Sequence, residues 1–148
     1  MKPEVDQILG LSASQLLGGI APLLPTGYAQ GAVSLVAFMM ILSAQEYERA
    51  ADIRVAENND VRALFKSLAA QVGDAELKAK LETAAATADS SLKISALDAA
   101  NYELRRLLIS LHIYMESQPG ENARAAEKSI WQTLRALADR RALKLPSQ

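Results

Sequence analysis

Hydrophobic residues recur along this chain at the spacing of α-helices, and the clearest case lies between residues 30 and 57. Apolar side chains three or four positions apart share one face of a helix. The residues on this face are Val33, Val36, Ala37, Met40, Ala44, Tyr47 and Ala51. The first half of the segment is apolar nearly all round, whereas Glu46, Arg49 and Asp52 give the second half a polar face. We therefore predict a long helix that continues to about Glu57.

Four further apolar residues flank that face, and the pattern does not show which part of the chain packs against them. They are Leu35, Phe38, Met39 and Leu42. If the other helices of the chain cannot cover these side chains, they form a dimer face or a ligand groove. Methionine is a side chain that adapts to such contacts. Both interpretations stay open at this point.

The uncharged run "GAVSLVAFMMILSA" raises the question of a membrane. The run is 14 residues long, whereas a helix that spans a bilayer needs about 20. A proline-rich turn precedes it, and Glu46, Glu48 and Arg49 follow it. We predict no membrane span, and expect a helix that is buried in a protein core or against a second subunit.

Proline and glycine mark the ends of the first predicted helix. It begins at Pro3, where the missing N–H costs nothing, and it is interrupted or ended at the glycine pair 18–19. Pro22 and Pro25 then disfavour a regular helix before the long segment begins. The polar run "ENND" at 57–60 either breaks the long helix or lies inside it.

Three boundaries divide the C-terminal half. A helix over residues 61–72 ends at Gly73 in the left-handed role that glycine often takes after a helix. Asp74 caps a short helix that follows. A long helix comes after the "DSS" at 89–91 and ends before Pro119.

Basic residues crowd the end of the last predicted helix, which starts near Asn122. Arg140, Arg141 and Lys144 lie there, where positive side chains interact favourably with the helix dipole. No hinge in the chain is long enough to separate domains. We therefore predict an all-α fold in a single domain over 1–148. Its architecture is an antiparallel helical bundle of four to six helices, two of them long.

Composition agrees with this fold class and excludes several kinds of function. Ala and Leu supply 49 of the 148 residues and aromatic residues only 5%, which favours helices over strands. The absence of Cys removes disulfides, thiolate nucleophiles and Cys-based zinc sites. A net charge of -1 creates no field that recruits nucleic acid, so we predict no nucleic-acid partner. The N-terminus is acidic, unlike a secretory signal, and we predict a cytoplasmic location.

Motifs for catalysis are missing from the residue pattern. The one histidine, His112, lies a helical turn from Glu116, but di-iron carboxylate bundles need two Glu-x-x-His pairs. The chain has no Gly-x-Ser-x-Gly elbow and no phosphate-binding glycine loop. We predict no catalytic residue, no metal and no cofactor, and we expect His112 to be a buried polar residue bonded to Glu116. An enzyme that uses His112 with nearby carboxylates is the weaker alternative.

Asn101 interrupts the apolar stripe of the long helix that follows residue 91. The stripe consists of Leu97, Leu104, Leu108, Leu111 and Met115. A buried amide needs hydrogen-bond partners, and such a group can fix the register between helices. We expect Asn101 to be a buried polar residue that serves register or local hydrogen bonding, and contact with a ligand is the alternative.

Three stretches of the first half, "PEVDQILGL", "LPTGYAQ" and "SAQEYERAA", together resemble one protein family. Its members are small bacterial helical proteins of unknown function, often encoded beside acyl-CoA dehydrogenases and aminoglycoside-phosphotransferase-like kinases. The resemblance covers residues 1–65 as a pattern of helices. Those proteins place an Arg and an Asn early in the second helix, where this chain is apolar and Phe38 replaces the Asn. The resemblance implies an accessory role in acyl-group metabolism and carries over no catalytic residue.

These observations together predict a soluble cytoplasmic protein without catalytic activity. We expect a homodimer or another homo-oligomer that acts through contacts between proteins. The alternative is a bundle that binds a small apolar or acyl ligand between the helix over 30–57 and the long helix after residue 91.

Overall fold

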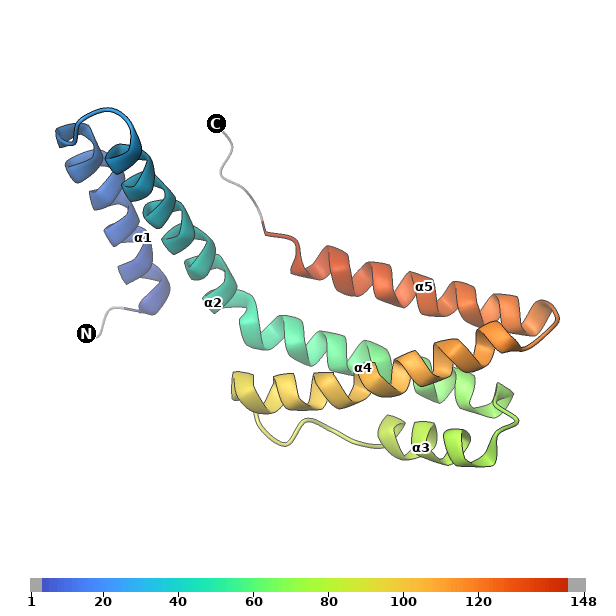
Figure 1. The fold of residues 1–148 in the computed structure, drawn as a ribbon. Coiled ribbons are helices and arrows are strands. Elements are labelled where there is room, and N and C mark those ends of the chain that lie inside the picture. The colour runs from blue at the N-terminus through green and yellow to red at the C-terminus, as the bar shows by residue number, and fades with distance from the viewer. Residues whose placement is uncertain (1–3, 144–148) are drawn as a thin grey trace. The chain divides into compact units, whose positions relative to one another are not determined.

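The computed structural model describes residues 4–143, and nearly all of them lie in helices (Figure 1). The α-helices are α1 (Val5–Gln15), α2 (Tyr28–Leu68), α3 (Ala75–Ala85), α4 (Ile94–Ser117) and α5 (Glu121–Arg141). Three short turns of other helix types are η1 (Leu16–Ile20), η2 (Ala21–Leu23) and η3 (Ala69–Gln71). No strand occurs between residues 4 and 143. The prediction of an all-α fold with two long helices is confirmed, because α2 has 41 residues and α4 has 24.

The described residues form two compact units. The first, which we call the hairpin unit, contains residues 4–50 together with Leu143. The second, the bundle unit, contains residues 51–142. α2 contributes its first part to the hairpin unit and residues 51–68 to the bundle unit. The prediction of a single domain over 1–148 stays a prediction.

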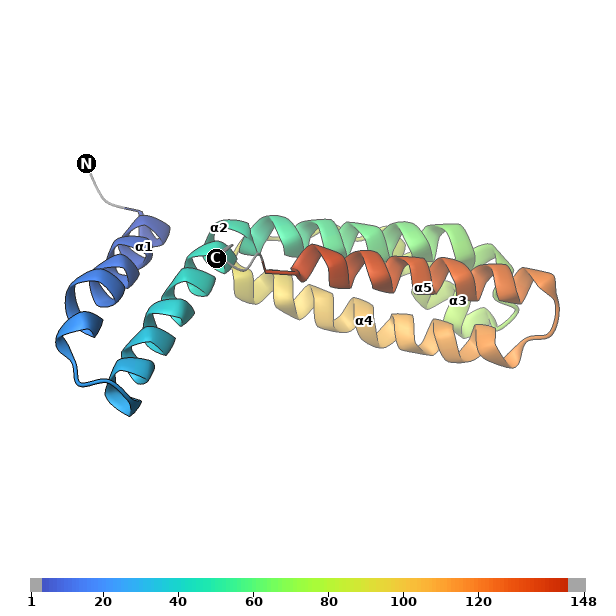
Figure 2. The ribbon, with the colours of Figure 1, turned by 90° about the horizontal axis from the view of Figure 1, so that it is seen from above.

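In the hairpin unit, α1 lies beside the first part of α2 (Figures 1 and 2). α1 begins at Val5, after Glu4 in an extended conformation, and Pro3 lies outside the described residues. The first helix was predicted to be interrupted or ended at Gly18-Gly19, and the regular α-helix gives way to another helix type over this stretch, after Gln15. The helical backbone passes through both glycines as the π-type turn η1 and then the 3-10 turn η2.

The chain leaves the helical conformation only at Leu24, which has φ -87° and ψ 149°. The cause is Pro25, because the residue before a proline is pushed away from the α region. Pro22 does not break η2, since it lies in the first turn, where its N–H would have no intrahelical partner. Gly27 has a φ of +121°, which favours glycine, and α2 begins at the next residue.

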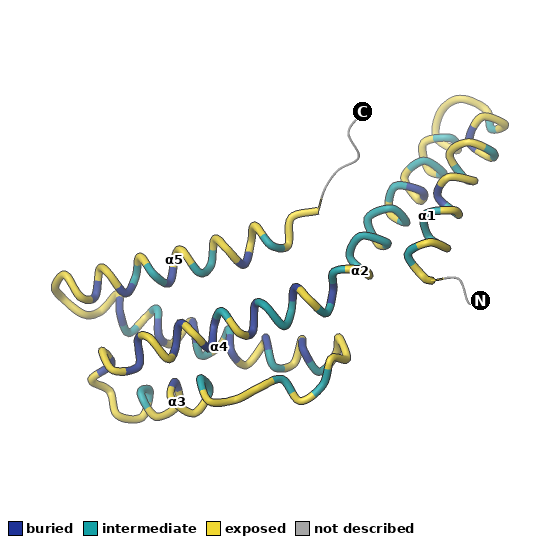
Figure 3. Tube along the Cα trace, turned by 180° about the vertical axis from the view of Figure 1, so that it is seen from behind, coloured by how far each residue is buried: buried dark blue, intermediate teal, exposed yellow. Residues whose placement is uncertain are grey.

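Small side chains form the interior of the hairpin unit. Ala13 of α1 and Ala37 of α2 are 1% and 0% exposed, and Ala21 is also buried. Figure 3 shows much of this unit in the colours of intermediate and exposed residues. The predicted core-facing side of the helix over 30–57 is not fully buried, because Val36 and Tyr47 are more than half exposed. The buried side of this part of α2 is narrow and centres on Ala37.

α2 runs without a break through residues 57–60, so the second of the two alternatives is the one observed. Glu57 lies one turn after Ile53 and one turn before Val61, on the buried side of the helix. Asn58 beside it is buried as well. Polar residues favour helix ends when their side chains bond to nearby backbone groups. Here both side chains bond to other helices, so the α2 backbone continues.

In the bundle unit, residues 51–68 of α2 join α3, α4 and α5 around one apolar core, and successive helices run in opposite directions (Figures 1 and 2). The predicted apolar stripe of α4 is buried at every position. Its members are Leu97, Leu104, Leu108, Leu111 and Met115. α5 buries Ala126, Ile130 and Leu137 against this core, whereas Trp131 is mostly exposed.

Two predictions concern the residues around the start of α3, and one is confirmed while the other is wrong. Asp74 caps α3 as predicted, because the Leu77 N–H donates to Asp74 Oδ1 at 2.8 Å. Gly73 does not take the left-handed conformation, since the positive φ angles of residues 4–143 are at Gly27 and Gly120. Instead, the Gly73 N–H donates to the Tyr114 hydroxyl of α4 at 2.8 Å. This bond ties the α2–α3 connection to α4.

Candidate functional site

Four polar side chains are buried inside the bundle unit. Glu57 and Asn58 are fully buried, and Arg62 and Asn101 are nearly so. A buried polar group without a partner costs about 1–3 kcal/mol, and a charged group costs more. Whether these residues stabilise or destabilise the bundle unit therefore depends on their hydrogen-bond and ion-pair partners. Together with three partners they form what we call the polar network, consisting of Glu57, Asn58, Arg62, Asp89, Asn101, Arg105 and Arg141.

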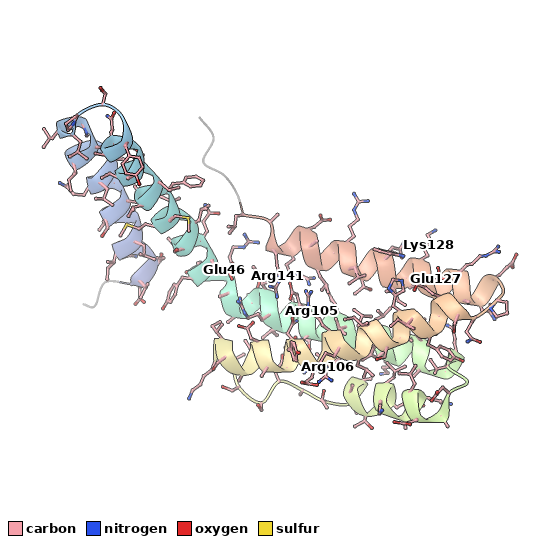
Figure 4. All side chains as sticks on the ribbon, viewed as in Figure 1. Glu46, Arg105, Arg106, Glu127, Lys128 and Arg141 are labelled. Atoms are coloured by element: carbon pink, nitrogen blue, oxygen red, sulfur yellow. The ribbon has the colours of Figure 1, made fainter. Side chains whose placement is uncertain are left out.

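Arg141, the last residue of α5, holds Glu57 by two parallel hydrogen bonds. Its Nε donates to Oε1 and its Nη2 donates to Oε2, both at 2.6 Å. Arg105 of α4 places Nη2 3.5 Å from the same Oε2. Figure 4 shows Arg105 and Arg141 among the side chains between the helices of this unit. Because a two-pronged guanidinium pairing is charge-assisted and directional, Glu57 connects α2 to both α4 and α5.

Asn101 continues the polar network from α4 back to α2. Its Nδ2 donates to Asn58 Oδ1 at 2.9 Å and to Glu57 Oε2 at 3.3 Å. Asn58 in turn donates to Asp89 Oδ1 at 2.9 Å and to the Leu97 carbonyl at 3.3 Å. The amide of Asn58 thus uses both its oxygen and its nitrogen, and the two asparagines fix how α2 and α4 meet.

Arg62 closes the far end of the polar network on the connection between α3 and α4. Its Nη2 donates to Asp89 at 2.7 Å, and its Nε donates to Thr87 Oγ1 at 3.1 Å. The third nitrogen, Nη1, donates to Asn59 Oδ1 at 3.4 Å. Every nitrogen of this buried guanidinium therefore has an acceptor. These bonds hold the α3–α4 connection against α2.

The two carboxylates of the polar network are held in their charged form. Burial raises the pKa of Glu57, but hydrogen bonds and charges from Arg141 and Arg105 outweigh burial and lower that pKa. The hydrogen bond from Arg62 lowers the pKa of Asp89 against the effect of burial, and Asn58 adds to the lowering. A general base needs a pKa near the working pH. These carboxylates are therefore weak proton acceptors at neutral pH.

The two predicted polar residues have different surroundings. Asn101 lies within the polar network, with partners on α2. His112 lies elsewhere on α4 and is only partly buried, with its side chain 18% exposed. Its Nε2 lies 3.5 Å from Glu116 Oε1 without a hydrogen bond, so the predicted bond to Glu116 is not made. Its ring meets the Trp131 ring edge-on, with 5.2 Å between centroids. Within residues 4–143, no group of three or more His, Asp or Glu side chains is arranged to hold a metal ion.

The four apolar residues predicted as an interface or groove lie in the hairpin unit, away from the polar network along the chain. Leu35 and Met39 are 61% and 56% exposed. Phe38 and Leu42 are half-buried. The exposed part of the predicted set is therefore Leu35 and Met39, and the other two residues lie at its edge.

An open pocket of about 600 Å³ lies in the bundle unit, lined by residues of α2, α3 and α4. Its lining combines apolar side chains with cationic ones, namely Ala84, Leu104, Leu107, Arg62, Lys80 and Arg106. Two of these cations already have acidic partners on their own helices. Lys80 pairs with Glu76 of α3, and Arg106 pairs with Glu103 of α4.

Glu57, Asn58 and the role of Arg141 were not predicted from the sequence. A signal was available, because Ile53, Glu57 and Val61 are four positions apart and Glu57 thus interrupts an apolar stripe. Arg140 and Arg141 were assigned only to the helix dipole, but Arg140 also pairs with Asp60 at 2.7 Å and Arg141 with Glu57. Lys144, predicted to act with them, lies outside the described residues.

No protein-family model, no curated protein and no solved structure matches this chain. The family resemblance of residues 1–65 and the role it implies stay predictions.

Proposed function

We propose that this protein is a non-catalytic accessory protein that acts by contact with another protein. In this proposal the bundle unit is a rigid scaffold and the hairpin unit carries the contact surface. The observation that carries the proposal is the concentration of exposed apolar side chains in the hairpin unit. The cytoplasmic location and the accessory role in acyl-group metabolism stay predictions that rest on the sequence.

Exposed apolar side chains are unevenly divided between the two units. Large apolar side chains are exposed at eleven positions of residues 4–50 and at six positions of the bundle unit, which is nearly twice as long. The eleven are Val5, Ile8, Leu11, Leu17, Ile20, Leu23, Tyr28, Leu35, Val36, Met39 and Tyr47. Soluble monomers rarely expose apolar patches above a few hundred Å². Such a surface is typical of a region that another molecule covers.

The polar network supports a structural role for the charges of the bundle unit. Glu57 is fully buried, and its carboxylate bonds to Arg141 and Asn101 and lies near Arg105. Asp89 bonds to Arg62 and Asn58. A catalytic carboxylate needs access to a substrate and a pKa suited to proton transfer. The bonding of these two carboxylates within the chain favours stabilisation over catalysis.

Site-specific photo-crosslinking tests the contact role. A benzophenone amino acid at position 35 of the hairpin unit is compared with one at position 109 of α4. Leu35 is 61% exposed and Ile109 is 60% exposed, so the two probes are equally accessible. We expect a discrete protein adduct in cells from position 35 and none from position 109. No adduct from position 35 would count against a contact role for the hairpin unit.

A second candidate function, binding of a small acyl or other amphipathic ligand, is favoured by the pocket lined by α2, α3 and α4. Its volume of about 600 Å³ lies in the range of small-molecule sites. Leu104 and Leu107 offer an apolar floor, and Lys80, which pairs with Glu76, also lines the pocket. Native mass spectrometry of freshly purified protein would then show a retained ligand that a Leu107→Glu variant loses. Wild-type protein without any retained mass would contradict this candidate.

A further inference from the structure

We propose that the hairpin unit inserts into a lipid bilayer while the bundle unit stays in water. This inference goes beyond the proposed contact role, because it gives the hairpin unit a surrounding of lipid, within which a contact with another protein would be made. Its support comes from where the large apolar side chains of the hairpin unit lie, how small its buried side chains are, and where charged and aromatic residues lie along its helices.

Large apolar side chains are exposed on both helices of the hairpin unit. α2 exposes Tyr28, Leu35, Val36, Met39 and Tyr47. α1 and its continuation through η1 and η2 expose Val5, Ile8, Leu11, Leu17, Ile20 and Leu23. The two helices lie side by side (Figures 1 and 2), so their outward sides face away from each other. A protein that covers the outward side of one helix leaves the other side exposed, whereas lipid covers both.

The buried side chains of the hairpin unit are small. They include Ala13, Ala21 and Ala37, whereas the bundle unit buries residues as large as Phe65 and Leu81. In water, a helix pair with alanines inside and larger apolar residues outside gains little from burial. In lipid there is no hydrophobic force between helices, and small residues at their contact let the two backbones approach closely. The arrangement of the hairpin unit is therefore the one that suits lipid.

The helices of the hairpin unit match the thickness of a bilayer. The chain has no charged residue between Asp6 and Glu46, and both of these lie at the end of the hairpin away from its connection at 24–27. Residues 5–23 and 28–47 each extend about 28 Å at 1.5 Å per residue, close to the hydrocarbon thickness of about 30 Å. The connection, whose backbone is not helical, then reaches the far head groups, where water satisfies its polar groups.

Tyrosines lie near both ends of the apolar part of α2. Tyr28 begins α2 and is 94% exposed, and Tyr47 directly follows Glu46 and is 52% exposed. Tyrosine is enriched at the two membrane–water interfaces, because its ring is apolar and its hydroxyl is polar. The exposed large side chains between the two tyrosines are Leu35, Val36 and Met39. An outward tyrosine at each end of such a span is typical of a membrane helix, and contact with a protein sets no such spacing.

The exposure of α2 distinguishes it from the core helix of a soluble protein. The helical segment Tyr28–Gln71 is long and apolar enough to cross a membrane, and only 6% of the apolar window that meets this test is buried inside the protein. A core helix meets the same test but is mostly buried. The apolar part of α2 therefore lacks the cover that a soluble fold would give it.

This proposal replaces the sequence-based prediction of no membrane span. That prediction compared the uncharged run of 14 residues with the about 20 that a spanning helix needs. In the structure, α2 begins before this run, at Tyr28, and stays uncharged through Gln45. A second apolar helix lies beside it. The unit that inserts is therefore a pair of helices with both charged ends on one side of the bilayer.

The polar side chains of α1 are compatible with insertion. Gln7 lies near the charged end, at the depth of the head groups. The Ser14 hydroxyl donates to the Gly10 carbonyl at 3.0 Å. Gln15 lies near mid-depth, and its amide fills the space beside Gly19, where an added Cβ would lie 2.5 Å from Gln15 Nε2. An amide at that depth favours a hydrogen bond to another membrane-inserted helix, which is the form that the proposed contact role would take.

Flotation of the full-length protein with phosphatidylcholine vesicles tests insertion. We expect the wild type to float, and about 1 M salt, which screens charges within about 3 Å, should not release it. Leu11→Asp/Leu35→Asp places a charge on each helix and should lower the floated fraction by about tenfold or more. The control Ile109→Asp/Ile113→Asp changes residues of α4 that are 60% and 62% exposed, and it should float like the wild type. A wild type that does not float overturns the proposal.

Single cysteines give a second test that needs no disruptive variant. The chain contains no Cys, so Leu11→Cys, Leu35→Cys and the control Ile109→Cys each introduce one thiol for a fluorophore. In vesicles whose lipids carry a nitroxide at the middle of the acyl chain, the fluorophores at positions 11 and 35 should both be quenched, and the one at position 109 should not. Quenching at only one of the two hairpin positions, or at neither, would contradict insertion of the pair.

These tests also separate insertion from the contact role. A protein that floats but gives no photo-crosslinked adduct from position 35 supports insertion and counts against the contact role. A protein that does not float but is crosslinked to another protein overturns insertion and keeps the contact role. A wild type that does not float and sediments as a dimer overturns insertion in favour of a second copy.

Discussion

Glu57 shows how a single charged residue can be placed in a helical core. Burying an isolated carboxylate is so costly that the group would become protonated instead. Arg141 supplies two hydrogen bonds to it, Arg105 supplies a second positive charge, and Asn101 a further donor. Replacing such an arrangement by apolar residues can be neutral or stabilising, whereas removing one partner is costly. Its contribution is therefore expected to lie in the register of α2, α4 and α5.

Removal of Arg141 tests this account. Arg141→Met leaves the buried Glu57 with Arg105 as its remaining cation, so we expect the free energy of unfolding to fall by about 2 kcal/mol. This is below the 3–5 kcal/mol typical of broken buried pairs, because the Arg141 side chain is 45% exposed. Urea unfolding followed by the fluorescence of Trp131 measures the loss. The control Arg135→Met breaks a surface pair with Asp139 and should cost under about 0.5 kcal/mol.

The same carboxylates predict how stability depends on pH. The folded pKa values of Glu57 and Asp89 lie below the ordinary values of 4.5 and 3.8. The unfolded chain therefore takes up protons first as the pH falls, and stability decreases from about pH 4.5 downward. Above that range the contribution of these groups is complete. Urea unfolding at a series of pH values should show a shallower decrease for Glu57→Gln than for wild type. Glu103→Gln, at an exposed position, should leave the profile unchanged.

Helices of this chain end where a residue such as proline restricts the backbone conformation. They continue through polar residues whose side chains bond to other helices. α2 passes through the polar run 57–60 because its polar side chains bond to other helices. The glycine pair 18–19 does not end the helical backbone, whereas Pro25 does so through the residue before it. At the start of α5, Gly120 has φ +105° and ψ 175°, a conformation that is essentially confined to glycine.

Gly120→Ala tests whether this conformation is required for the α4–α5 connection. An added Cβ meets no atom within 4 Å, so the expected cost comes from the backbone alone, about 1–3 kcal/mol. Urea unfolding followed by Trp131, which lies on α5, should report a destabilised bundle unit. Gly10→Ala lies within α1 and also meets no atom within 4 Å. That control should not lower the Trp131 transition, and equal losses in both variants would contradict the account.

Across the whole molecule, the two units differ in how they treat large apolar side chains. The bundle unit buries them, as at Phe65, Leu81 and Ile130. The hairpin unit buries alanines and exposes many of its larger residues. The apolar core that stabilises a single copy is therefore concentrated in the bundle unit.

Substitution of the two phenylalanines of the chain tests this difference in burial between the two units. Phe65 is fully buried in the bundle core, whereas Phe38 is half-buried in the hairpin unit. We expect Phe65→Ala to cost about 3–5 kcal/mol, through lost burial and the cavity left behind. Phe38→Ala should cost clearly less. Thermal unfolding by circular dichroism ranks the two variants, and a larger effect at position 38 would contradict the assignment of the main core.

Local patterns determined much of the fold. The stripe from Leu97 to Met115 predicted the buried face of α4, and Asp74 predicted the start of α3, because period and capping are properties of neighbouring residues. The amide of Asn101 stood out for the same reason, as a polar group within an apolar stripe. No local pattern, however, predicts which residues of other helices bond to this amide.

Only the tertiary structure decided those features that depend on contacts between residues far apart in the sequence. The pairing of Glu57 with Arg141 joins residues 84 positions apart. Of the two alternatives that the sequence left open at residues 57–60, a break or continuous helix, the structure has the continuous helix. The burial of Ala37 beside exposed Leu35, Val36 and Met39 depends on which side of α2 meets α1. The sequence determined that residues 30–44 form an apolar helix, because helical periodicity is local. Only the fold decided which of its sides this chain leaves uncovered, because burial depends on what surrounds each side.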